Sequence, residues 1–198
     1  MEQVSVTIYD FRELSSDVQD KLVEQYRNTN VEGQFWFEDI VADWKEKLES
    51  FGFDNPKIYF SGFGCQGDGA CFTCKDVDLA KYADHLIMQT ESYDQAKWLQ
   101  VFGLLYDKGL ASAKIYQVGN YTHENSISLQ YEVLVQSEDV HQRFNGLMDH
   151  IEQAMVKISK AIYRDLEDQH EYLTDDISVM ESFRANEMKF LSDGSVWA

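Results

Sequence analysis

Hydrophobic and polar residues alternate or recur at helical spacing over most of the chain. The first segment alternates at Val4, Val6 and Ile8 and predicts a strand. The Ser-Asp-Val-Gln pattern at Ser16 to Gln19 is that of a capping box and predicts the start of a helix. The apolar face of this helix would be Val18, Leu22, Val23 and Tyr26.

A second helix is expected over residues 35–51, with Gly52 in the position where glycine commonly ends a helix. Its buried stripe would be Phe37, Ile40, Val41, Trp44 and Leu48. Residues 58–63 and 70–74 alternate as two strands of a hairpin around a glycine-rich turn at 64–69. Further along, the patterns predict helices over 76–88 and 92–106 and a hairpin of 115–118 with 126–135. A long helix is expected over 140–172 and a last helix from a Thr174 cap to 186. The chain would close with a hairpin of 189–191 with 195–197.

Hairpins mixed with helices, without regular strand–helix–strand units, favour an α+β fold with a mainly antiparallel sheet and one long helix. The chain has 198 residues and a single proline, Pro56, so no proline-rich linker divides it. We therefore expect one α+β domain over residues 1–198.

The charge balance is strongly acidic, with 17 Lys+Arg against 35 Asp+Glu and a net charge of −18. Such a surface repels phosphate backbones, so direct binding to duplex nucleic acid is not expected. Acidic, solvated helix faces are the simpler interpretation, and an acidic mimic of nucleic acid is the alternative. The sequence contains no apolar run of membrane-spanning length and no export signal, so we expect a cytoplasmic location without membrane association.

The segment from Ser61 to Phe72 carries four glycines, Gly62, Gly64, Gly67 and Gly69. Glycine allows positive φ and close approach of the backbone to a ligand, so successive amides here could bind an anion. A tight hairpin explains two of the glycines equally well. The candidate ligand-binding residues in this segment are Ser61, Gly62, Gln66, Gly67, Asp68 and Gly69.

Known nucleotide-binding loops are not matched, because no Lys or Arg occurs between Ile58 and Cys74 and the glycines precede a strand instead of a helix. Cys65, Cys71 and Cys74 with His85 or His123 suggest a zinc site, but only one Cys-x-x-Cys pair is present. Inert, reduced thiols are the favoured interpretation, with no metal and no cofactor.

The second loop adds Tyr121, His123 and Glu124 to the candidate ligand-binding residues. If the two hairpins meet, His123 with Glu124 or Asp68 could act as a general base with its orienting carboxylate. A solvated histidine is the alternative. Trp36 is the last candidate, because helical periodicity directs it away from Ile40 and Trp44, toward a pocket or a partner.

Several segments together resemble a family of small phage and prophage proteins, some of which are labelled antitoxins of toxin–antitoxin systems. The most specific is Ser-Gly-Phe-x-x-Gln-Gly-Asp-Gly-Ala-x-Phe at residues 61–72. The other matching segments are 26–30, 36–39, 119–124, 163–167, 171–174, 185–187 and 193–194. The family commonly has serine at the position of Cys65 and glycine at that of Cys74, which argues against zinc. The resemblance implies an accessory protein in a bacterial host cytoplasm and supplies no catalytic residues.

Four hypotheses follow for the function. The first is a non-catalytic protein that binds and neutralises a bacterial host protein, in an anti-defence or antitoxin-like role. The second is a binder that sequesters a small nucleotide-type ligand in a pocket at the glycine-rich hairpin. The third is a metal-assisted hydrolase using Asp68, His123 and Glu124, and the fourth is the nucleic-acid mimic. The sequence is also compatible with an oligomer.

Overall fold

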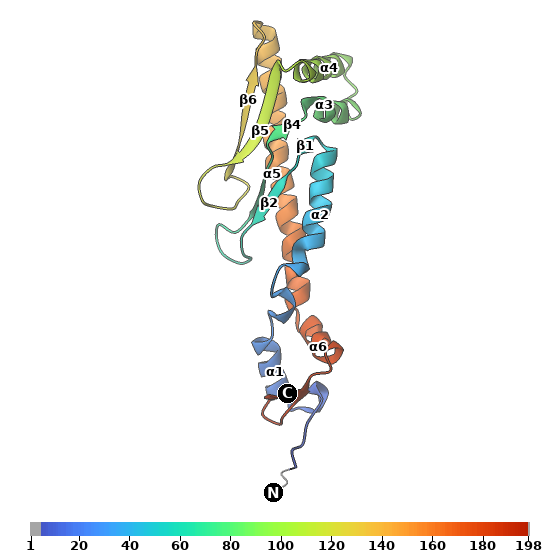
Figure 1. Cartoon of the computed structure of the whole chain (residues 1–198), viewed down its shortest axis with the longest axis vertical. Coiled ribbons are helices and arrows are strands. Elements are labelled where there is room, and N and C mark those ends of the chain that lie inside the picture. Colours follow the sequence, from blue (N-terminus) through green and yellow to red (C-terminus); the bar gives the residue numbers. More distant parts are fainter. Residues whose placement is uncertain (1–4, 198) are drawn as a thin grey trace. The chain divides into compact units, whose positions relative to one another are not determined.

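The computed structural model describes residues 5–197 (Figure 1). The chain divides into two compact units, one of residues 1–38 with 167–198 and one of residues 39–166. The boundary falls within two helices, α2 (Phe35–Ser50) and α5 (Glu138–Thr174). Helices with small antiparallel hairpins confirm the α+β class. The expectation of a single domain concerns folding of the whole chain and stays a prediction.

The first unit is built from short elements around an aromatic core. They are η1 (Phe11–Glu13), α1 (Ser16–Gln25), η2 (Thr29–Val31), α6 (Asp176–Ala185), β7 (Lys189–Phe190) and β8 (Val196–Trp197). Phe183 is at the centre of the core, with its ring centroid 5.1 Å from that of Phe11 and 5.5 Å from that of Phe190. Leu14, Leu22, Val23 and Val179 complete the buried cluster.

Asn30 joins the two chain segments of the first unit. Its side-chain amide donates to the carbonyl of Leu173 at 3.0 Å, and its oxygen accepts from the Ser182 hydroxyl at 2.6 Å. Both partners lie more than 140 residues away in sequence, at the end of α5 and in α6. These bonds therefore hold the N-terminal segment to the C-terminal helices.

Three local predictions in the first unit are wrong. Val6 and Ile8 are exposed and outside any strand; pairing begins only at Tyr9, which bridges Phe190, and Val4 lies outside the described residues. The first helix is capped at Ser15, not through a box starting at Ser16. The cap of the last helix is Asp175, whose carboxylate accepts from the Ile177 amide. At the two helix starts the boundary is shifted by one residue, which a single sequence does not resolve, and only Asp175 makes a side-chain capping bond.

The second unit contains an antiparallel sheet of two hairpins. In the first hairpin, β1 (Phe53–Asp54) pairs with β4 (Asp76–Val77) and β2 (Lys57–Phe60) pairs with β3 (Ala70–Thr73) in one continuous register. In the second, β5 (Ala111–Gln117) pairs with β6 (Ile127–Val133). Reciprocal backbone bonds between Cys74 and Ile115 join the hairpins.

One face of this sheet is buried and the other is open. Ala111, Ala113 and Ile115 are buried, whereas Ser112, Lys114 and Tyr116 between them are exposed. On the buried side, Tyr131 of β6 meets Phe144 of α5 at a centroid distance of 6.0 Å. The stripe of α5 predicted from its period is confirmed by buried Phe144, Leu147, Met148, Ile151, Met155, Ile162 and Leu166.

Two helices, α3 (Leu79–Ile87) and α4 (Tyr93–Asp107), connect the hairpins and pack on each other. Phe102 of α4 contacts Phe144, and Phe53 contacts both Phe72 and Tyr82. The prediction of a helix from residue 76 is wrong, because Asp76 and Val77 pair as β4 and Asp78 caps α3. The predicted hairpins, the helix ending before Gly52 and the long helix are confirmed. The stripe predicted for α2 is only partly so, because Leu48 is buried whereas Phe37, Ile40, Val41 and Trp44 are half-buried.

Candidate functional site

The glycine-rich hairpin is held by bonds within itself. The Asp68 carboxylate accepts from the Cys65 amide at 2.7 Å, and the Asp68 amide donates to the Cys65 carbonyl at 3.1 Å. Gly64 and Gly67 have φ of +115° and +105°, a conformation that side chains disfavour. These two glycines are therefore required by the turn.

The second loop, residues 118–126, is also closed by its own bonds. The amide of His123 donates to the Ser126 hydroxyl at 2.9 Å, and this hydroxyl donates to the His123 carbonyl at 2.7 Å. The Nδ1 atom of His123 lies 3.0 Å from the Glu124 carboxylate. The imidazole and the carboxylate that sequence analysis paired are thus adjacent.

The two loops meet at Gly69. A Cβ atom added there would lie 3.0 Å from His123 Cδ2, 3.1 Å from His123 Cα and 3.3 Å from the Thr122 carbonyl oxygen. Ser61 reinforces the contact, because its hydroxyl accepts from the Gly69 amide at 3.0 Å and lies 3.3 Å from the Thr122 oxygen. We call this contact of residues 61–69 with residues 122–126 the loop junction. Glycine at position 69 is required by close approach, not by its φ angle.

Helix α5 contacts both loops of the loop junction. The Lys160 ammonium lies 3.5 Å from the second oxygen of Glu124, and the Tyr163 hydroxyl donates to the Gly62 carbonyl at 3.3 Å. The ring of Tyr163 also packs on Phe63, with centroids 5.4 Å apart. Both loops are therefore in contact with the same helix.

The loop junction buries one of the cysteines. The side chain of Cys71 is inaccessible, and burial raises the pKa of its thiol, which also bonds Ser126 and the His123 backbone. Burial raises the pKa of Cys74 to about 12, and Cys65 is exposed. Within residues 5–197, no three His, Cys, Asp or Glu side chains are grouped as metal ligands.

The predicted ligand-binding residues thus fall into two groups. Residues 61–69 and 121–124 come together in the second unit, where Tyr121 is 78% exposed and Gln66 is also exposed. Trp36 belongs to the first unit, where its ring meets Phe37 and His170 at centroid distances of 5.3 and 5.6 Å. The role of all these residues in ligand binding stays a prediction.

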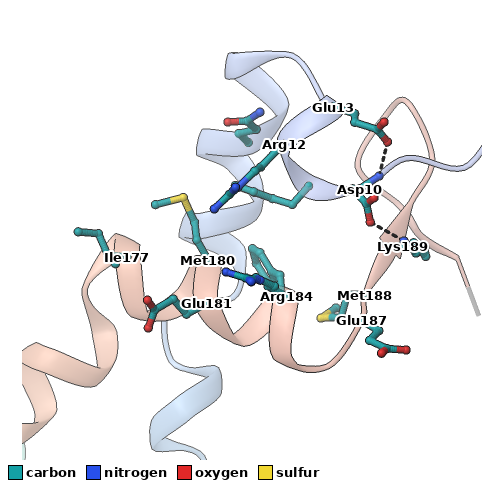
Figure 2. A pocket seen from close by; sticks show the side chains of 13 residues that line it. Asp10, Arg12, Glu13, Ile177, Met180, Glu181, Arg184, Glu187, Met188 and Lys189 are labelled. Atoms are coloured by element: carbon teal, nitrogen blue, oxygen red, sulfur yellow. Dashed lines mark hydrogen bonds and ion pairs between the residues drawn. The ribbon is translucent and has the colours of Figure 1, made fainter.

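The first unit also contains a hollow of about 1040 Å³ that no sequence pattern predicted (Figure 2). Its apolar lining consists of Phe11, Ile177, Met180, Phe183 and Met188. Its charged lining is mixed, with Arg12, Arg184 and Lys189 beside Asp10, Glu13, Glu181 and Glu187. No ion pair within the described residues involves the guanidinium of Arg12 or of Arg184. Because it draws on residues 10–19 and 177–189, no local motif indicates it.

A second, shallow hollow of about 330 Å³ lies on the open face of the sheet in the second unit. Lys57, Tyr59, Lys75 and Tyr116 line it, together with Asn55, Thr73 and Gln117. The sequence pattern that indicates this hollow is the alternation of lysine and tyrosine with apolar residues in segments 57–60 and 111–117.

The chain belongs to a protein family described as a domain of unknown function, DUF8835, whose model matches residues 36–176. The match includes both loops and the whole sheet. Neither the curated proteins nor the solved structures contain a match to this chain. Along residues 5–197, none of the helices combines the length and apolar character needed to cross a bilayer.

Proposed function

We propose that the chain is a phage accessory protein that binds and neutralises a bacterial host factor without catalysis. The interaction would take place in the host cytoplasm, in an anti-defence or antitoxin-like role. The proposal is supported by one feature above all: in the loop junction the polar groups bond each other, while Tyr121 and the tip of the glycine-rich hairpin are exposed.

The bonding pattern favours recognition over hydrolysis. The Asp68 carboxylate is used by its own turn, and Glu124 lies between His123 and Lys160. A hydrolytic site needs a base and a carboxylate that converge on a substrate-sized cleft. Neither of the two hollows described above includes residues 61–69 or 121–124.

Exposed aromatic side chains on a fixed frame are effective anchors for a protein partner, because little conformational entropy is lost on binding. Tyr121 is the strongest candidate, with 78% of its surface exposed on a loop that is tied to the hairpin and to α5. A partner would bury this ring, and the exposed residues 64–67 of the other loop belong to the same proposed surface.

The proposal is tested by affinity purification of the tagged chain from bacterial lysate, followed by measurement of the dissociation constant for any protein recovered. Replacing Tyr121 with Ala should weaken binding by at least tenfold, as expected for an interface anchor. Tyr93, at the start of α4 and 85% exposed, provides the matched control Tyr93→Ala. If no partner is recovered at low salt, or both variants bind equally, the proposal fails. A partner that binds DNA and is released steeply by salt would identify the nucleic-acid mimic instead.

Small-molecule binding is a second candidate, favoured by the hollow in the first unit. Its volume is at the upper end of the range of ligand sites, about 300–1,000 Å³. An anionic ligand such as a nucleotide-type signal would bind beside Arg12 and Arg184, which form no ion pair within the described residues, and away from the acidic side chains that also line the hollow. Thermal shift against a nucleotide panel, repeated with Arg184→Gln, tests it: a stabilisation that this variant removes supports the candidate, and no shift with any nucleotide rejects it.

A further inference from the structure

The open face of the sheet in the second unit has a charge opposite to that of the chain as a whole. Two rows of side chains cross this face. In the first, Lys57 lies opposite Thr73, and Tyr116 and Ser128 follow on β5 and β6. In the second, Lys75 lies beside Lys114, and Gln130 follows on β6. The two rows therefore carry three lysines and no acidic residue, in a chain with 35 Asp+Glu and 17 Lys+Arg.

The three lysines are available to a ligand. Lys57, Lys75 and Lys114 are exposed, and within residues 5–197 none of them forms an ion pair. This contrasts with Lys160, Lys189 and Arg143, which are each paired with a carboxylate. Cations left unpaired on a surface surrounded by acid are a site for an anionic group.

Aromatic rings stand among these lysines. Tyr59 and Tyr116 are 38% and 43% exposed, and both line the shallow hollow with Lys57 and Lys75. The paired strands fix the backbone positions of both tyrosines, so that their exposed rings are available for stacking on flat groups. Thr73, Asn55 and Gln117 add hydrogen-bonding groups at the same place.

We propose that this face, defined by Lys57, Tyr59, Lys75, Lys114 and Tyr116, binds a short segment of single-stranded nucleic acid. Lysines contact the phosphates, and the tyrosine rings stack on bases that a duplex would keep inside. An acidic peptide would satisfy the lysines but would leave the two exposed rings without flat partners. The net charge of −18 repels the remainder of a long strand, so only about three phosphates are held.

The inference predicts a specific dependence on salt. Neutralisation of about three phosphates gives a slope of about −2 in a plot of log affinity against log salt, so affinity falls about 20-fold between 50 and 200 mM. Replacing one lysine with Gln should make the slope shallower by about 0.7. Lys157→Gln, an exposed lysine on α5, should leave it unchanged.

The experiment is fluorescence anisotropy of labelled single-stranded RNA and DNA oligonucleotides, eight nucleotides long, titrated with the full chain. Duplex DNA and a polyglutamate peptide are the competitors. Tyr116→Leu should weaken binding about tenfold and Tyr116→Phe should preserve it, because stacking needs the ring and not the hydroxyl. A preference for the RNA or the DNA strand identifies the source of the ligand.

Three outcomes would overturn the inference. They are no binding at 50 mM salt, equal loss with Tyr116→Leu and Tyr116→Phe, and competition by polyglutamate as strong as that by the unlabelled strand. The last outcome would assign the face to an acidic protein segment. The Tyr121→Ala variant should bind the oligonucleotide normally, so this inference can fail or succeed independently of the proposed function.

Discussion

Replacing Gly69 with Ala tests the loop junction directly. The φ angle of Gly69 is not in the left-handed region, so an added methyl group causes no backbone strain. It would instead lie 3.0 Å from His123 Cδ2 and 3.1 Å from His123 Cα. The Cα atom is backbone and cannot rotate away, so the two loops have to separate by a few tenths of an ångström.

Overpacking of this kind costs about 1–3 kcal/mol of unfolding free energy. We expect a value of about 2 kcal/mol, because the separation also stretches the bond from the Gly69 amide to the Ser61 hydroxyl, now 3.0 Å long. With a urea m-value of about 2 kcal/mol/M, the unfolding midpoint falls by about 1 M without a change in slope.

Gly62→Ala is the matched control in the same hairpin. Its φ angle is also ordinary, and an added Cβ would come no closer than 3.7 Å, to the Asp68 carboxylate. Its unfolding free energy should therefore stay within about 0.5 kcal/mol of the parent value. The reactivity of the Cys71 thiol is a second measurement, because residues 123–126 cover this thiol in the parent chain. If Gly69→Ala and Gly62→Ala have the same stability and the same Cys71 reactivity, the loop junction does not exist as described.

Three further predictions concern the rest of the chain. With a thiol reagent, the native chain should react rapidly at exposed Cys65 only, and at Cys71 and Cys74 only on unfolding; rapid reaction of all three would contradict their burial. Asn30→Ala should lower the unfolding free energy by about 2 kcal/mol, because the Ser182 hydroxyl and the Leu173 carbonyl lose a partner. Exposed Asn120→Ala should have no effect in the same urea titration, and equal effects would refute the role of Asn30. Burial raises the pKa of Tyr82 from 10.0 to about 12. Between pH 10 and pH 12 the folded chain therefore keeps a phenol proton that the unfolded chain loses. The free energy of unfolding should fall as the pH rises through this range. The urea midpoints at pH 9 and pH 11 should therefore differ less in Tyr82→Phe than in the parent chain. If the difference between the two midpoints is unchanged, Tyr82 is not a source of the loss of stability at high pH.

The sequence by itself determined the elements with strong periodicity. The buried stripe of α5 follows from apolar residues at three- and four-residue steps, and the β2–β3 hairpin follows from alternation around a turn that needs Gly64 and Gly67. The negative charge and the candidate residues of both loops were also evident, because they depend on residue type alone. The ends of the elements were less certain. Asp76 suits a helix start but pairs with Asp54 in a strand, and Thr174 suits a helix cap but the cap of α6 is its neighbour Asp175.

Only the tertiary structure decided which residues meet. Gly69 has no turn function, and its reason for being glycine is His123, 54 positions further along the chain. Likewise, Lys57, Lys75 and Lys114 are separate along the sequence and become one basic face only when the strand register is known. Hydrophobic periodicity acts over a few residues, whereas these contacts depend on how hairpins pair over long separations, which local patterns do not encode.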